Sequence, residues 1–220
     1  MVTKRSTEAG TRDRAKSETR EALLRAALAL IPERGLDVSL DDICDRAGYT
    51  RGAFYVHFTD RDALLAAVME RVGRGVLDAL IGATGGGDDL GLVVTRFLGG
   101  LSTGAYPLTR AGGVRPYQLL DACARSPEVR KQYVTLVREA VARLADTLGA
   151  GQKRGTIRGD LRPADVGMLL VALAIGVHTL VDLEVPLDLG SAAQSLVALG
   201  LAPVTSKRAR SPRARRTRRT

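Results

Sequence analysis

Apolar residues recur along most of this 220-residue chain at the three- and four-residue spacing of an amphipathic helix. The clearest stripe predicts a helix over 90–101 and consists of Leu90, Val93, Val94, Phe97, Leu98 and Leu101. Further stripes predict helices over 18–34, 59–81, 115–125, 126–148, 163–181 and 191–199. No segment of useful length alternates with a period of two, and no fixed repeat is present. The pattern therefore predicts an all-α protein of about nine helices.

Helix-start signals divide the N-terminal part of the chain into short units. Ser39 followed by Asp42 forms a capping box, and Gly48 ends the short helix that the box begins. Thr50 can cap the next short helix, and Thr59–Asp62 reads as a second capping box that opens a long helix. Two short helices joined by a tight turn form the helix-turn-helix arrangement.

The same signals mark the C-terminal helices. Ser126 is expected to cap the helix that begins at Pro127, and Gly149 and Gly151 are expected to end it. Ser191 is expected to cap the last helix.

The turn at 47–49 has a geometry that suits DNA binding. Gly48 can adopt a positive φ, which lets the second helix leave the first at a steep angle. The N-terminus of that helix presents unpaired amides and a partial positive charge to a phosphate. Four of the chain's eight aromatic residues lie within 49–58, and a helix this short needs some of them as anchors. An Ala-Gly turn alone also occurs in structural corners, but the capping boxes and aromatics in register favour DNA binding.

With its flanks, the segment AGYTRGAFYVHFTDRDALL over 47–65 resembles the DNA-binding domain of the TetR family of bacterial one-component repressors. The resemblance runs from about Glu18 to Arg71, and the rest of the chain is similar only in helix count and apolar character. The residues in register are Gly35, Ser39, Ile43, Ala47, Gly48, Gly52, Tyr55, His57 and Phe58. Arg61 departs from the pattern, because the family usually has Lys there.

The resemblance implies a role for each residue of the motif. The residues implied to contact the phosphate backbone are Ser39, Thr50, Tyr55, His57 and Arg61. Tyr49 and Arg51 are implied to face base edges, with Gly52 allowing close approach. The side-chain chemistry of Arg51 is consistent with this role, because a planar guanidinium can pair with O6 and N7 of guanine. Phe54 and Phe58 are assigned to the core.

Four segments follow from this comparison. We expect a flexible basic arm over 1–17, a DNA-binding domain over 18–78, a ligand-binding and dimerisation domain over 79–203, and a disordered Arg-rich tail over 204–220. The resemblance implies a cytoplasmic homodimer that represses transcription by binding double-stranded DNA at a palindromic operator. It also implies release when a small-molecule effector enters the C-terminal domain.

Two helices of the C-terminal domain are apolar almost all round. Those over 166–181 and 191–199 carry more apolar surface than one neighbour can cover, so we expect them to pack on their twofold mates as a four-helix bundle. The candidate effector-pocket residues are Phe97, Tyr117, Cys123, Tyr133, Met168 and His178. A few polar tips among apolar walls suit a largely hydrophobic molecule, although core packing explains each residue singly as well.

The net charge of +9 comes almost entirely from the C-terminal end, because 204–220 hold eight Lys and Arg residues and no Asp or Glu. Such a segment is solvated, and near DNA it can also act as a nonspecific arm through counterion release.

The sequence argues against several classes of protein. Two cysteines cannot form a disulfide framework, and neither they nor His178 have metal-ligand spacing. The chain has no cofactor fingerprint and no catalytic constellation, so an enzyme is improbable. The N-terminus has no apolar signal region, and the uncharged run over 166–181 falls short of a membrane span, which leaves the cytoplasm as the expected location. The alternative to a DNA-binding regulator is an all-α interaction module without specific DNA binding.

Overall fold

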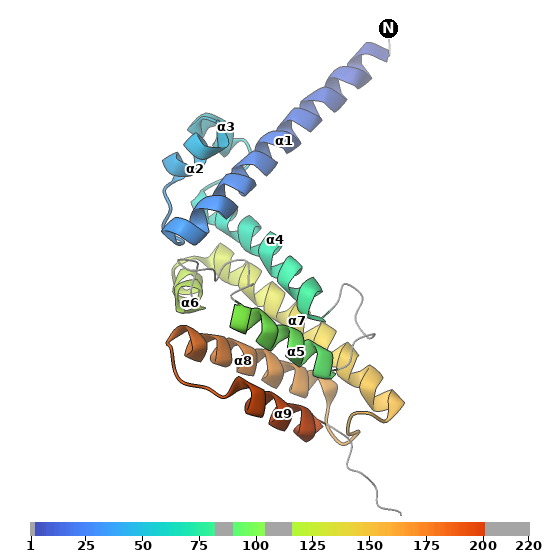
Figure 1. Cartoon of the computed structure of the whole chain (residues 1–220). Coiled ribbons are helices and arrows are strands. Elements are labelled where there is room, and N and C mark those ends of the chain that lie inside the picture. The colour runs from blue at the N-terminus through green and yellow to red at the C-terminus, as the bar shows by residue number, and fades with distance from the viewer. Residues whose placement is uncertain (1–2, 82–89, 104–115, 201–220) are drawn as a thin grey trace, which may run out of the picture.

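A computed structural model describes residues 3–81, 90–103 and 116–200 of the chain. These residues form nine α-helices and no β-strand, which confirms the predicted all-α class (Figure 1). The helices are α1 (Thr3–Arg34), α2 (Leu40–Ala47), α3 (Arg51–Tyr55), α4 (Arg61–Ile81), α5 (Leu90–Thr103), α6 (Pro116–Arg125), α7 (Pro127–Arg154), α8 (Pro163–Asp182) and α9 (Leu189–Gly200).

The first three helices form the N-terminal unit. The second half of α1 packs on α2 and α3, with Leu23, Ala27 and Ile31 fully buried between them. The Gly35 amide closes the end of α1 by donating to the Ile31 carbonyl at 2.8 Å. This closure turns the chain toward α2, so the short helices lie against the side of α1.

The helix α1 corrects the predicted N-terminal arm. The helix begins at Thr3, so residues 3–17 are helical, and they extend beyond the rest of the molecule in Figure 1. The apolar stripe starts only after residue 18 and therefore could not predict this extension. Adding residues to a helix that is already nucleated costs little, which explains why a polar segment continues it.

The long helix α4 connects the two halves of the molecule. It packs against α1 at its beginning and against α5 and α7 further along. Its cap is Asp60 and not Thr59, because Oδ1 of Asp60 accepts from the Ala63 amide at 2.8 Å. Leu64 and Leu65 complete the core of the N-terminal unit, while Leu77 and Ile81 belong to the C-terminal half.

The C-terminal half is a stack of helices in which α7 lies between α4 and α8, with α9 against α5 (Figure 1). Ser126 caps α7 as predicted, accepting from the Val129 amide at 3.3 Å. However, α7 continues through Gly149 and Gly151 and ends at Gly155. The last helix is capped by Asp188 and not Ser191, since the Asp188 carboxylate accepts from the Ser191 amide at 2.9 Å.

The helix α8 lies at one side of the stack and is barely buried within a single chain. By length and composition it could cross a membrane, so the prediction that this segment is too short for a span was wrong. One such helix is weak support for a membrane protein, because apolar helices of soluble proteins pass the same test.

Some predicted segments lie outside the described residues. These are the start of the N-terminal arm at residues 1–2 and the basic tail over 204–220.

Candidate DNA-binding surface and effector cavity

The turn between α2 and α3 has the predicted helix-turn-helix geometry. Gly48 adopts a φ of 75°, in the left-handed region where a side chain would be strained. Its amide donates to the Asp45 carbonyl at 3.2 Å, and the Tyr49 amide donates to the Cys44 carbonyl at 3.0 Å. These bonds close α2 and turn the chain sharply into α3.

The short helix α3 is held by its cap and by aromatic packing. The Thr50 hydroxyl accepts from the Ala53 amide at 3.2 Å. Phe54 is fully buried, and its ring centroid lies 5.4 Å from those of Tyr55 and Phe58. Phe58 is buried as well, with the Arg20 guanidinium over its ring. Both phenylalanines therefore belong to the core, as predicted, and they fix a helix that is too short to be stable alone.

The opposite side of α3 faces solvent. Thr50, Arg51 and Gly52 are exposed at its start, and Tyr55 is 55% exposed at its end. Tyr49 lies beside them at 36% exposure. The structure therefore brings five of the predicted DNA-contacting residues onto one surface. Arg51 forms an ion pair there, with Nε 3.3 Å from Oδ1 of Asp41.

His57 lies at the edge of this surface and is partly buried. Burial lowers its pKa, and the nearby charges of Lys16 and Arg20 lower it further, so the imidazole is neutral at pH 7 in the free protein. These two cations belong to α1 and would favour a phosphate beside His57. The sequence did not predict a role for Lys16 or Arg20, because nothing in a local motif shows which face of α1 lies next to α3.

Ser39 and Arg61 are occupied within the protein. The Ser39 hydroxyl donates to the Asp42 carboxylate at 2.6 Å and accepts from the Asp42 amide. Arg61 is about 30% exposed and donates through Nε to the Val38 carbonyl at 2.9 Å. Both residues hold the connection between α1 and α2 in place, and their phosphate contacts stay predictions.

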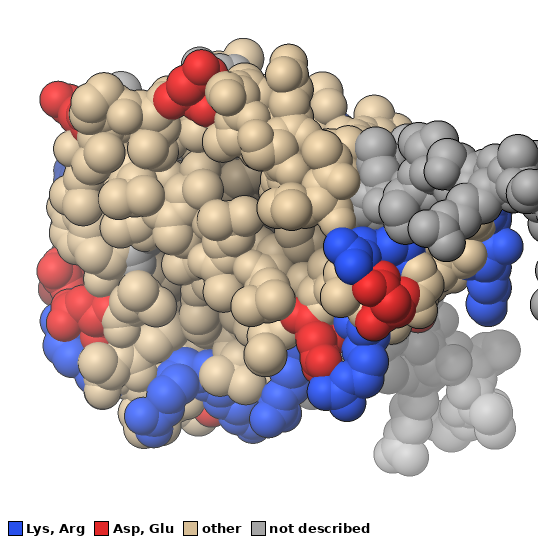
Figure 2. Space-filling view, turned by 90° about the horizontal axis from the view of Figure 1, so that it is seen from below, with Lys and Arg blue, Asp and Glu red and all other residues tan. Residues whose placement is uncertain are grey.

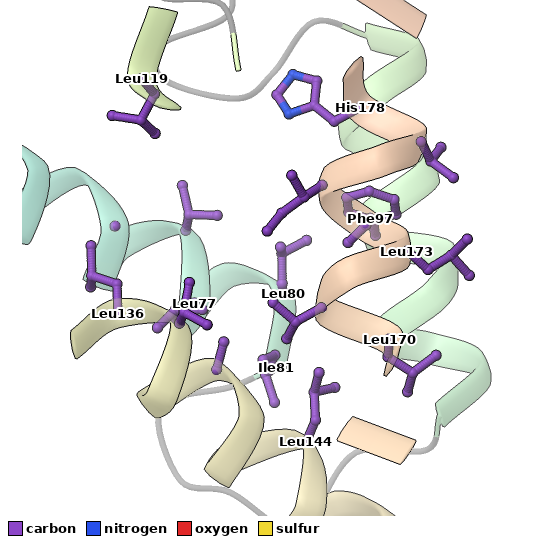
Figure 3. Close-up of a pocket in the computed structure, with 18 of the residues that line it drawn as sticks. Leu77, Leu80, Ile81, Phe97, Leu119, Leu136, Leu144, Leu170, Leu173 and His178 are labelled. Carbon is purple, nitrogen blue, oxygen red and sulfur yellow. The ribbon is translucent and has the colours of Figure 1, made fainter. Parts of the chain in front are cut away.

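An apolar cavity of about 430 Å³ lies between α4, α5, α7, α8 and α9. Figure 3 shows leucine and isoleucine side chains of α4 and α7 on one side of it and side chains of α8 on the other, with Leu119 of α6 opposite His178. Among the described residues, no Asp, Glu, Lys or Arg lines the cavity. At one end it reaches Ile31 and Leu36, which belong to the N-terminal unit.

The six candidate pocket residues do not all lie at the cavity. Phe97, Tyr133 and His178 line the cavity. Cys123 is buried nearby but is not part of the lining. Tyr117 and Met168 were wrongly placed, because their side chains are 49% and 58% exposed on the outer sides of α6 and α8.

Both polar groups of the lining are uncharged near neutral pH. Burial lowers the pKa of His178, which outweighs the opposing effect of Asp182. Burial also raises the pKa of Tyr133, and so does the nearby Cys123. The cavity wall can therefore offer hydrogen bonds but carries no formal charge at pH 7.

Comparison with known proteins agrees with this geometry. Residues 23–68 match the family model described as "Bacterial regulatory proteins, tetR family". The match covers the end of α1, all of α2 and α3, and the start of α4. The N-terminal part of the chain is therefore similar to the DNA-binding region of TetR-family proteins.

Curated relatives match the chain over a quarter to a third of its length. An HTH-type transcriptional regulator of Bacillus subtilis (strain 168), YvdT, is 37% identical over 34% of this chain and 39% of its own length. The HTH-type transcriptional repressor BepR of Brucella suis biovar 1 (strain 1330) is 45% identical over 25% of this chain and 27% of its own length. The match thus spans two fifths or less of either relative.

Solved structures of TetR-family regulators match over both halves. A regulator from Rhodococcus sp. has a TM-score of 0.68 at 23% identity, covering 84% of this chain and all of that one. SmeT, the repressor of the Stenotrophomonas maltophilia multidrug efflux pump SmeDEF, has a TM-score of 0.60 at 27% identity, covering 85% of this chain and 94% of its own. SmeT has also been solved in complex with triclosan, and that structure is 26% identical at a TM-score of 0.60, covering 84% of this chain and 93% of its own.

The molecule also presents a broad apolar face on the side opposite the candidate DNA-binding surface. Figure 2 views the molecule from the side of α8 and α9, and charged side chains are sparse over much of that face. Exposed apolar residues of these helices include Leu169 (64%), Leu173 (46%) and Leu199 (69%). This confirms that the two helices are not covered within one chain, as the sequence predicted.

Proposed function

We propose that this protein is a sequence-specific DNA-binding transcriptional regulator that acts as a repressor. The observation that carries the proposal is the outward face of α3, where Tyr49, Arg51 and Tyr55 are exposed around a buried Phe54 anchor. A recognition helix needs this division, because one face must read DNA while the other is fixed in the core. The family match over 23–68 supports the same role for this segment.

A footprint tests this function. The purified protein, mixed with fragments of its genome, should protect a palindromic site at nanomolar concentration and physiological salt. A random duplex of equal length is the control. Binding all fragments no better than the random duplex would favour the alternative, an all-α interaction module without specific DNA binding.

We further infer that the protein acts as a homodimer joined through α8 and α9. Two recognition helices one helical turn apart read a palindrome, and a twofold interface provides that arrangement. The exposed apolar residues of α8 and α9 supply a surface that monomeric soluble proteins rarely leave uncovered.

We propose that the cavity binds a small effector that is largely apolar and carries no charge. An ion placed there would lose its hydration without gaining an oppositely charged partner, because the lining is uncharged. Tyr133 and His178 can each exchange a hydrogen bond with one polar group of the ligand. The complex of SmeT with triclosan is a TetR-family example of a compact aromatic ligand.

Two probes of similar size test the ligand class. Triclosan, an apolar phenol, should raise the melting temperature and release labelled operator DNA, whereas a quaternary ammonium compound should do neither. The variant Leu80→Glu, which places a carboxylate in the lining, should reduce the response to the phenol. A stronger response of the unaltered protein to the ammonium probe would contradict the proposal.

We assign no catalytic role to the protein and place it in the cytoplasm, where operator DNA is accessible. The family that residues 23–68 match is described as one of regulatory proteins, which supports this assignment.

A further inference from the structure

The ion pair between Arg51 and Asp41 lies within the DNA-binding surface. Arg51 is the first residue of α3, and its Nε is 3.3 Å from Oδ1 of Asp41 in the first turn of α2. The two side chains are 60% and 64% exposed. An exposed pair of this kind contributes little to stability. The main effect of the ion pair is therefore on the position of the Arg51 guanidinium.

Asp41 is attached to a rigid part of the protein. The next residue, Asp42, pairs with Arg34 of α1 at 2.6 Å and with the Ser39 hydroxyl at 2.6 Å. Ile43, two residues after Asp41, is fully buried. On the other side of the ion pair, the Thr50 cap and the Phe54 anchor fix α3. Neither end of the pair depends on a loop that could move the carboxylate away.

We propose that Asp41 is a positioning residue that sets base specificity through Arg51. A guanidinium carries five N–H donors in a planar fork, and a guanine takes two of them through O6 and N7. The contact at Nε restrains the plane of the fork before DNA arrives. A long side chain that is already oriented loses less conformational freedom on binding, and it tolerates fewer alternative bases. The inference rests on the proposed DNA-binding function and on Arg51 facing base edges.

The chain provides a matched control for the charge of Asp41. Asp45 lies on the same short helix and is exposed, and no ion pair links it to Arg51 in the described part of the chain. Replacing either aspartate by asparagine removes one negative charge from the surface. Both changes should therefore strengthen binding to every DNA sequence by a similar factor. Only a change at Asp41 releases the guanidinium.

The experiment compares the full-length protein with its variants Asp41→Asn, Asp41→Glu, Asp45→Asn and Arg51→Ala. Affinities are measured for the operator and for operators with each base pair substituted in turn. The base pair whose preference disappears in Arg51→Ala is the one that Arg51 reads. We expect Asp41→Asn to reduce the preference at that pair about fivefold, a part of what one bidentate contact supplies. Asp45→Asn should leave it unchanged, and Asp41→Glu should restore part of it.

The outcomes are distinguishable. Equal preferences for Asp41→Asn and Asp45→Asn, in proteins with the same melting temperature, would show that the ion pair has no part in specificity. A sharper preference in Asp41→Asn would mean that Asp41 competes with DNA for Arg51, and this also overturns the inference. If Arg51→Ala loses no base preference, Asp41 cannot act through it. If the unaltered protein prefers no sequence, the proposed function itself fails.

Discussion

The exposed side chains of α3 differ in what they can recognise on DNA. A guanidinium can pair with a base edge in the major groove, whereas a phenol hydroxyl at the helix end suits a phosphate. We therefore propose that Arg51 and Tyr55 make two separable contributions, to specificity and to general affinity, although they lie on the same short helix.

Substitution of these two residues should separate the contributions. Arg51→Ala should cost about 1–3 kcal/mol at its cognate base pair and relax the preference there. Tyr55→Phe removes only a hydroxyl from a side chain that is 55% exposed, so it should weaken binding to all sequences alike, by about tenfold. Competition binding with a set of substituted operators measures both effects. An altered base preference in Tyr55→Phe would show that the two roles are assigned wrongly.

The partly buried imidazole of His178 should make stability depend on pH. Its folded-state pKa lies below the ordinary value near 6.5, chiefly because burial disfavours the charged form. As the pH falls from about 7 to 5, the unfolded chain takes up a proton at this site before the folded protein does, so folding is destabilised. The variant His178→Gln should lose less stability over that interval. Denaturant unfolding at several pH values gives the comparison, and equal losses would exclude this contribution.

At the scale of whole elements, the contact between α4 and α7 depends on one small residue. A Cβ atom added to Gly73 would lie 2.4 Å from Cδ1 of Leu136, which is buried on α7. Gly75, two residues along α4, has open space at the same position. The backbone of α4 therefore approaches α7 closely at only one of these two glycines.

The two glycines should respond to alanine in opposite directions. Gly75→Ala should raise the free energy of unfolding by about 0.5–1 kcal/mol, because alanine loses less backbone freedom in a helix. Gly73→Ala should lower it by about 1 kcal/mol, because the Leu136 side chain, which lines the cavity, must move aside. Urea unfolding of both variants measures the difference. A stabilised Gly73→Ala protein would show that Leu136 relaxes without cost.

Local sequence patterns predicted which helices exist better than where they end. Apolar periodicity and the signals at Ser39, Gly48 and Ser126 marked structure correctly, because a cap and its helix are neighbours in the chain. The predicted end of α7 at Gly151 was wrong, because this glycine lies inside the helix. A Cβ atom there would meet the Ile157 side chain at 2.6 Å, so the glycine permits close packing and does not end the helix.

The DNA-binding surface and the cavity also differ in how well the sequence could predict their residues. The DNA-binding surface is built from one contiguous segment, so its register could be recognised in the sequence. The cavity is lined by residues of seven helices, and whether a residue faces it depends on how each helix is rotated against the others. Periodicity cannot supply that rotation, which is why Met168 was selected although it lies outside the cavity lining, whereas His178, ten residues further along α8, lies in it.

At the scale of the whole molecule, the exposed face of α8 should determine the oligomeric state. The variant Leu169→Glu places a carboxylate at a position that is 64% exposed in one chain. We expect the unaltered protein to sediment as a dimer at micromolar concentration and this variant as a monomer with weakened operator binding. Val134→Glu, at a position that is 38% exposed on α7 and belongs to neither α8 nor α9, is the control and should remain dimeric. A stable monomer of the unaltered protein would end the dimer proposal.

The basic residues of 207–220 should act on DNA affinity and not on sequence preference. Removing them eliminates all eight cations of the C-terminal end. Each phosphate contact contributes up to about 0.9 to the slope of log affinity against log salt, so truncation should flatten that slope. Specific and nonspecific binding should weaken by similar factors. An unchanged slope in the truncated protein would show that the tail does not take part in binding.

The cavity extends from Ile31 and Leu36, beside the DNA-binding helices, to Ala193 and Leu196 on α9. A molecule that fills it would touch elements belonging to both proposed activities, DNA recognition and subunit association. Free energies around a thermodynamic cycle must sum to zero, so an effector that weakens operator binding tenfold is itself bound tenfold more weakly by the operator complex. The amount of operator DNA in the cell would then set the effector concentration at which the genes respond. The response threshold would therefore depend on the operator DNA as well as on the protein.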